Sequence, residues 1–147
     1  MCVVCLPHSP TPLPCTQEND YHFNPTHNTW EWHEAEAQKR GMSLASVVSE
    51  EEHRLLHKIT KGAETWLGGC RKSTSRQPPD LIDPTRFKGA DDWEWSDGTP
   101  WSFTIWNQIE PNNGSGGEDR VYMSKNSWYD SNSGKNMAGI YQKARCS

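Results

Sequence analysis

The side chains best suited to chemistry in this sequence are oxygen-bearing ones concentrated between positions 110 and 130. Carboxylates and a carboxamide stand there in Gly- and Asn-rich segments: Glu110, Asn112, Glu118, Asp119 and Asp130. Hard oxygens of this kind suit Ca²⁺, which takes about six to eight of them in a flexible shell. Zinc would need His or Cys nearby, and none stands between residues 71 and 145. Loop carboxylates are more often simply solvated, so the residues alone leave both interpretations open.

Two helices are predicted in the first half of the chain. Asn28 or Thr29 can cap an amphipathic run over residues 30–39. Further on, Ser49 followed three residues later by Glu52 is typical of a capping box, in which each residue satisfies the other's backbone donor. We therefore expect a second helix to begin directly after Ser49.

Short strands are predicted mainly in the second half, separated by long Pro-, Gly- and Asn-rich loops. The apolar or alternating segments that favour strands are 65–69, 93–96, 121–123, the residues around Trp128, and 138–141. Helices followed by short strands indicate an α+β fold. The Pro- and Cys-rich residues 1–15 are expected to form an extended arm, and residues 16–147 a single domain.

The composition excludes several classes of protein. The chain has 147 residues, of which 33% are hydrophobic and 8 are Trp, so we expect a core built from a few large aromatic rings. The formal charge of -4 and the scattered cations argue against nucleic-acid binding, and Arg71, Lys72 and Arg76 are interpreted as a solvated loop. No apolar run approaches the ~20 residues that span a bilayer, so no membrane insertion is expected. No Gly-x-Ser-x-Gly nucleophile motif is present, and the chain is not expected to be an enzyme.

Several motifs in a fixed order resemble the carbohydrate-recognition domain of C-type lectins, over about residues 16–146. They are Gly-Met-Ser-Leu-Ala-Ser at 41–46, Trp-Leu-Gly-Gly at 66–69, Trp-Glu-Trp-Ser-Asp-Gly-Thr-Pro at 93–100, Trp106-Asn107, Glu-Pro-Asn at 110–112, Gly-Glu-Asp at 117–119 and Trp-Tyr-Asp at 128–130. The resemblance implies a C-type lectin-like fold with two helices, short antiparallel β-sheets and a long loop region.

The resemblance also implies a function and a set of site residues. In such lectins, residues matching Glu110 and Asn112 flank a cis proline, bind Ca²⁺ and hold two sugar hydroxyls, while those matching Glu118 and Asp130 complete the site. The Glu-Pro-Asn order is similar to that of mannose-type sites, which take mannose, fucose or N-acetylglucosamine. The expected partners are therefore glycans, bound weakly at ~1 mM per site and more tightly by an oligomer, outside the cell.

The sequence departs from the family pattern at the metal site. The resemblance places an Asn ligand where this chain has Tyr129, and a phenol is a poor ligand for Ca²⁺ at neutral pH. Asn132 is a candidate substitute. An auxiliary calcium site built on Asp119 with other acidic residues of the preceding loop is a further alternative, although such residues are more often turn formers: Asp91, Asp92 and Asp97.

The cysteines depart from the pattern as well. The family's four core cysteines would fall near Ala37, Arg120, Ser133 and Tyr141, and all four are absent. The five cysteines present are Cys2, Cys5, Cys15, Cys70 and Cys146. Cys5 and Cys15 resemble the extra amino-terminal disulfide of longer family members, and Cys70 with Cys146 is a candidate substitute bridge. These departures favour a second hypothesis, a calcium-independent domain that binds a protein or another non-sugar ligand through exposed Trp and Asn side chains.

Overall fold

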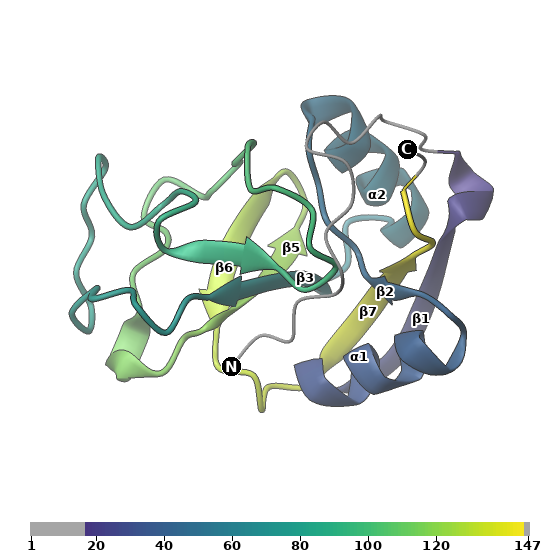
Figure 1. The fold of residues 1–147 in the computed structure, drawn as a ribbon, viewed down its shortest axis with the longest axis horizontal. Helices are drawn as coiled ribbons and strands as arrows, with labels where there is room; N and C mark the ends of the chain where they lie inside the picture. Colours follow the sequence, from purple (N-terminus) through teal and green to yellow (C-terminus); the bar gives the residue numbers. More distant parts are fainter. Residues whose placement is uncertain (1–16, 146–147) are drawn as a thin grey trace.

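The computed structural model describes residues 17–145, and it confirms an α+β fold with two helices (Figure 1). The strands form a single mixed sheet instead of the expected short antiparallel sheets. A short 3₁₀ turn at Glu18–Asp20 leads into the first strand. The remaining elements, in chain order, are β1 Tyr21–Asn28, α1 Trp30–Lys39, β2 Ser43–Leu44, α2 Glu50–Thr60, β3 Thr65–Arg71, β4 Trp93–Trp95, a 3₁₀ turn at Gly114–Gly116, β5 Arg120–Ser124, β6 Ser127–Ser131 and β7 Met137–Gln142. The predicted arm at residues 1–15 lies outside the described residues and stays a prediction.

Both predicted helices form, and each begins at a side-chain cap. Thr29 Oγ1 accepts a hydrogen bond from Trp32 N at 3.2 Å, which fixes the start of α1. Ser49 Oγ accepts one from Glu52 N at 3.2 Å at the start of α2. The Glu52 carboxylate does not return to the Ser49 amide as a capping box requires, and instead accepts from Val48 N at 2.9 Å. Only one half of the predicted capping box is therefore present.

The strands lie in one sheet, in the order β1-β7-β3-β5-β6, with β2 paired to β7 and β4 to β3. Strands β3 and β7 run parallel, whereas every other pair of these strands is antiparallel. Strand β1 was not predicted, because Pro25 lies within it and proline is unusual inside a strand. Residues 25–27 of this strand are exposed. Figure 1 shows the two helices grouped around β1, β2 and β7, while the long loops occupy the other end of the molecule.

Tryptophan rings form the centre of the core, as the composition predicted. Trp95 stacks on Trp101 with ring centroids 4.3 Å apart and meets Trp128 edge-on at 5.3 Å. Trp93 and Trp106 extend this cluster. All eight Trp residues lie within the described part of the chain, and each is buried or half-buried. The hypothesis of a binding surface of exposed Trp side chains is therefore wrong.

Two glycines allow β3 to pack closely against its neighbours. A Cβ on Gly68 would lie 2.7 Å from the Leu44 carbonyl oxygen, and one on Gly69 would lie 2.5 Å from Val121 Cγ2. Neither approach is possible for a larger residue without movement of the backbone or of a buried side chain. The close backbone approach predicted for the Trp-Leu-Gly-Gly segment is confirmed.

The positions that correspond to the missing core cysteines hold other stabilising contacts. Ala37 and Tyr141 are fully buried in one cluster, where the Tyr141 hydroxyl lies 2.6 Å from His33 Nδ1. At another of these positions, the Arg120 guanidinium lies 4.7 Å from the centre of the Trp30 ring. These contacts stabilise the two regions without the bridges that the family pattern places there.

Of the five cysteines, Cys70 is the one within the described residues. Cys70 is buried in the same cluster as Ala37 and Tyr141. Its proposed partner Cys146 lies outside the described residues, and so do the other three cysteines. The Cys5–Cys15 and Cys70–Cys146 pairings both stay predictions. Among residues 17–145, no helix is long and apolar enough to cross a membrane.

Candidate functional site

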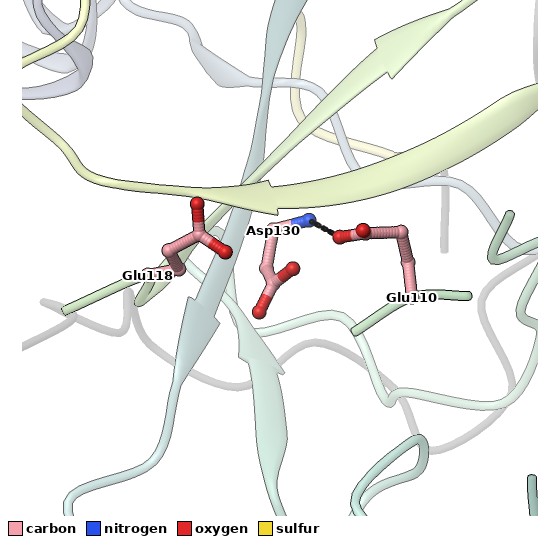
Figure 2. Close-up of side chains that lie close together, drawn as sticks. All are labelled: Glu110, Glu118 and Asp130. Carbon is pink, nitrogen blue, oxygen red and sulfur yellow. Dashed lines mark hydrogen bonds between the residues drawn. The ribbon is translucent and has the colours of Figure 1, made fainter. Parts of the chain in front are cut away.

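Three carboxylates converge at the end of the sheet that carries the long loops. Glu110, Glu118 and Asp130 each place a ligand oxygen within 4.8 Å of the other two, and Asp130 lies between the two glutamates (Figure 2). We call this group the carboxylate cluster. Two oxygens on opposite sides of a Ca²⁺ ion, each about 2.4 Å from it, would lie at most ~4.8 Å apart. The spacing of the carboxylate cluster therefore fits a single calcium ion.

Asp130 on β6 fixes the loop that supplies the other ligands. Its Oδ2 accepts a hydrogen bond from Asn113 N at 2.7 Å, and its Oδ1 accepts one from Asn112 N at 3.2 Å. In return, Asp130 N donates to Glu110 Oε2 at 3.3 Å. Asp130 is 3% exposed, so these backbone donors replace the water that its charge would otherwise need. A strand residue thus sets the position of the Glu-Pro-Asn segment.

Glu118 is held by the turn that precedes it. Its Oε1 accepts from Gly114 N at 2.7 Å, and its own amide donates to Asn113 Oδ1 at 3.1 Å. A Cβ at position 114 would lie 2.8 Å from Glu118 Oε1, so the carboxylate occupies space that only glycine leaves open. Asn113 has a left-handed backbone, with φ 50°, which turns the chain back toward β6. Glu118 Oε2 is the oxygen left for a ligand.

Asn112 lies beside the carboxylate cluster on the same loop. It is half-buried, and its Oδ1 accepts a hydrogen bond from Gly114 N at 3.0 Å. The peptide bond between Glu110 and Pro111 is cis, as the resemblance implied. The structure thus places all four predicted site residues on two adjacent segments, with three of them in the carboxylate cluster and Asn112 at its edge.

Tyr129 does not take the place of the missing Asn ligand. Its ring stacks on that of Tyr122 with centroids 5.1 Å apart, and its hydroxyl accepts a hydrogen bond from Asn107 Nδ2 at 3.1 Å. The suggested substitute, Asn132, is exposed and its Oδ1 accepts from Gly134 N at 2.8 Å within its own turn. Neither Tyr129 nor Asn132 therefore directs a side-chain oxygen to the carboxylate cluster.

Three residues that hold the site together were not predicted from the sequence. Arg71 was interpreted as part of a solvated loop, yet its side chain is only 7% exposed and pairs with Asp130 at 3.0 Å. Gln77 and Asn113 are also buried, and Asn113 Nδ2 donates to the Gln77 carbonyl at 2.9 Å. One signal for Arg71 was available, because it stands only two positions after the predicted strand segment 65–69, and it is the last residue of the buried strand β3.

The acidic residues considered for an auxiliary calcium site are dispersed. Asp97 accepts from Ser46 Oγ at 2.8 Å, and Asp92 accepts from Ser75 Oγ at 2.7 Å. Asp119 pairs with Arg71 at 3.3 Å. Within residues 17–145, the carboxylate cluster is the one group of three or more potential His, Cys, Asp or Glu ligands. The turn-forming interpretation of Asp92 and Asp97 fits these contacts.

Burial and the nearby charge of Asp130 make ionisation of the two glutamates, Glu110 and Glu118, unfavourable without a cation. Burial, followed by the hydrogen bond with the Asp130 side chain and the negative charge of Asp130, raises the pKa of Glu110 to about 9, although the hydrogen bond from Asp130 N acts in the opposite direction. Burial also raises the pKa of Glu118, although its hydrogen bond from Gly114 N acts in the opposite direction. A divalent cation would remove this repulsion, so proton and metal are expected to compete for the site.

This competition predicts a pH dependence of stability for the calcium-free protein. The folded-state pKa of Glu110, about 9, exceeds its ordinary value of 4.5. The contribution of the protonated Glu110 carboxyl group to the free energy of unfolding is therefore fully present below pH 4.5, and it is lost as pH rises through about 9. Thermal unfolding in EGTA, followed by Trp fluorescence, should show the wild type losing stability relative to Glu110→Gln over this interval. Parallel profiles for the two proteins would contradict the assignment.

Comparison with known proteins identifies the family. The two helices, mixed sheet and long loops form the C-type lectin-like fold. A family model described as "Lectin C-type domain" matches residues 26–140. This chain belongs to the C-type lectin domain family.

Three similar proteins are a lectin by name, an ice-structuring protein and an antifreeze protein. The type-2 ice-structuring protein of Hemitripterus americanus is 33% identical over 92 residues, covering 61% of this chain and 45% of that protein. Ladderlectin of Oncorhynchus mykiss is 29% identical over 130 residues, covering 82% and 60%. The solved structure of a Ca²⁺-dependent type II antifreeze protein, in its Ca²⁺-free form, matches with TM-score 0.68 and 28% identity over 84% of this chain and 90% of that one. This chain therefore matches about half the length of the first two relatives, and none of the three is named as an enzyme.

Proposed function

We propose that this domain binds glycans of the mannose type through a Ca²⁺ ion held by Glu110, Asn112, Glu118 and Asp130. The convergence of three carboxylates within 4.8 Å carries this proposal, because only Asp130 of the three pairs with Arg71 and neither glutamate has an ion-pair partner among the described residues. Calcium would supply the charge that makes the arrangement favourable. Membership of the C-type lectin domain family supports the same conclusion.

The positions of the oxygens support direct sugar coordination. Glu110 uses Oε2 to accept from Asp130 N, which leaves Oε1 for the ion or a hydroxyl. Asp130 Oδ1 accepts only the Asn112 amide, so it has a second lone pair available. A sugar with two adjacent equatorial hydroxyls would displace water from the ion, while Glu110 and Asn112 hold the same hydroxyls. The ligand would stay partly hydrated, so weak binding near ~1 mM per site is expected, and an oligomer on the outside of the cell would add avidity.

Calorimetric titration tests this proposal in two stages. We expect the wild type to take up Ca²⁺, then to give weak heat with mannose and none with galactose. The double variant Glu110→Gln, Asn112→Asp should retain Ca²⁺ binding but shift its preference from mannose toward galactose, because the hydroxyl-holding groups exchange roles. Asp91→Asn, an exposed carboxylate outside the cluster, is the matched control and should behave as the wild type. Absence of heat with several millimolar Ca²⁺ would refute the proposal.

A second candidate function is binding of a non-sugar ligand without calcium. The similarity to the ice-structuring protein of Hemitripterus americanus favours it, as does Tyr129, whose hydroxyl is engaged by Asn107 and not by the carboxylate cluster. Inhibition of ice recrystallisation measured with and without EGTA separates the two functions. Inhibition that persists in EGTA would support the second candidate, while its absence under both conditions would exclude ice as the ligand.

A further inference from the structure

A buried arginine beside the carboxylate cluster is surrounded by oxygen atoms on several sides. The Arg71 guanidinium contacts four of them: Asp119 Oδ1 at 3.3 Å, Asp130 Oδ2 at 3.0 Å, the Glu118 carbonyl at 3.0 Å and Gln77 Oε1 at 2.5 Å. We call these four oxygens the oxygen cage. The Trp93 ring covers the guanidinium at 4.4 Å from its carbon to the ring centre.

The oxygen cage is chemically a set of ligands for a hard cation. It combines two carboxylates, a backbone carbonyl and a carboxamide, which are the donor types that Ca²⁺ takes. The group at its centre is the guanidinium, which stays protonated at all physiological pH values. A cavity of about 360 Å³ opens beside the cage and is lined by Arg71, Gln77 and Asp119, so solvent ions have access to this region.

We propose that Arg71 is a built-in cation that occupies a second cation site, and that a small neutral side chain at position 71 converts the oxygen cage into a Ca²⁺ site. In the intact chain, Arg71 supplies the positive charge that Asp119 and Asp130 require and excludes a metal ion from the space between them. The loop of residues 110–119 is thereby tied to β3 and β6 at any calcium concentration. A metal ion in this place would dissociate when the calcium concentration falls, whereas the Arg71 side chain is covalently attached to the chain and stays.

Asp130 connects the oxygen cage to the carboxylate cluster. Its Oδ2 is fully used, because it accepts from both Arg71 Nη2 and Asn113 N. Its Oδ1 therefore remains on the side of the carboxylate cluster. Arg71 thus acts as a positioning residue for Asp130, while the cluster itself remains available for a different cation.

The test is to count bound Ca²⁺ by equilibrium dialysis with atomic absorption. Arg71→Ser is expected to bind one Ca²⁺ more per chain than the wild type. Arg71→Lys, which keeps the charge, should bind the same number as the wild type. The double variant Arg71→Ser, Asp119→Asn should lose the additional ion, because it removes a carboxylate that belongs only to the oxygen cage.

Asp119→Asn in the otherwise intact chain keeps the inference testable if Arg71→Ser fails to fold. Asp119 is half exposed, so this variant should fold, and it should bind as many Ca²⁺ ions as the wild type. Loss of one ion would show that Asp119 binds metal despite Arg71, and would overturn the inference. A folded Arg71→Ser variant that binds no additional ion would overturn it as well.

The same experiment separates this inference from the proposed function. A wild type that binds no Ca²⁺, together with an Arg71→Ser variant that binds one, would refute the carboxylate cluster as a metal site and support the oxygen cage. A wild type that binds one ion, with no additional ion in Arg71→Ser, would support the carboxylate cluster as a metal site and refute the inference about the oxygen cage.

Discussion

Asp130→Asn should abolish calcium binding and lower the free energy of unfolding by about 3 kcal/mol or more, since removing one partner of a buried ion pair leaves the other charge uncompensated. The Asp130 side chain is fully buried and pairs with Arg71 at 3.0 Å. It also accepts the Asn112 and Asn113 amides, so the substitution places an amide group opposite backbone donors. Denaturant unfolding and calorimetric titration with Ca²⁺ measure the two effects.

Asp119→Asn is the matched control for this prediction. Asp119 pairs with the same arginine but is half exposed, and exposed ion pairs contribute about 0–1 kcal/mol. The control should therefore lose little stability and keep its calcium affinity. If Asp130→Asn and Asp119→Asn were equally stable, the central position of Asp130 in the site would be contradicted.

Glu52→Gln should destabilise the domain by about 3–5 kcal/mol without changing the calcium affinity of the folded protein. Glu52 and Arg145 are each 1% exposed and form a two-pronged ion pair at 2.7 and 2.8 Å. Neither residue contacts the carboxylate cluster. The pair joins the start of α2 to the segment after β7, so its loss should be seen in global unfolding and not in ligand binding. Denaturant unfolding together with calcium titration provides the measurement.

Two further variants distinguish a buried-charge effect from a general effect of substitution. Glu50→Gln breaks an exposed ion pair with Arg54 on the same helix and should cost at most about 0.5 kcal/mol. The double variant Glu52→Leu, Arg145→Met removes both buried charges and should recover most of the stability lost in Glu52→Gln. A double variant less stable than Glu52→Gln would show that packing, and not the unpaired charge, determines the loss.

Local hydrogen bonds explain which elements could be predicted from the sequence. The caps at Thr29 and Ser49 accept from amides three residues further on, so a short stretch of sequence contains all the information that starts each helix. The same is true of the Gly68–Gly69 pair, whose small size indicates close packing whatever the partner is. The partners themselves, Leu44 and Val121, could not be read from the sequence.

The candidate site was predictable in its residue types but not in its arrangement. The motifs identified Glu110, Asn112, Glu118 and Asp130 as oxygen ligands, and the structure places them on two adjacent segments. The role of Arg71 was interpreted wrongly, because a basic residue beside Lys72 at the start of a polar loop has the composition of a solvated surface. Its burial depends on Asp130, which lies 59 positions further along the chain.

The sequence by itself determined the helix starts, most strands, the aromatic character of the core and the set of oxygen-bearing side chains. These follow from residue type and from interactions between near neighbours in the chain. The tertiary structure alone decided that β3 pairs parallel with β7, that Tyr129 stacks on Tyr122, and that Glu52 finds Arg145 across 93 positions. Contacts of this kind depend on which distant segments become neighbours in the fold. A charged side chain can be buried at low cost only where a neighbouring segment provides an opposite charge or a hydrogen-bond partner.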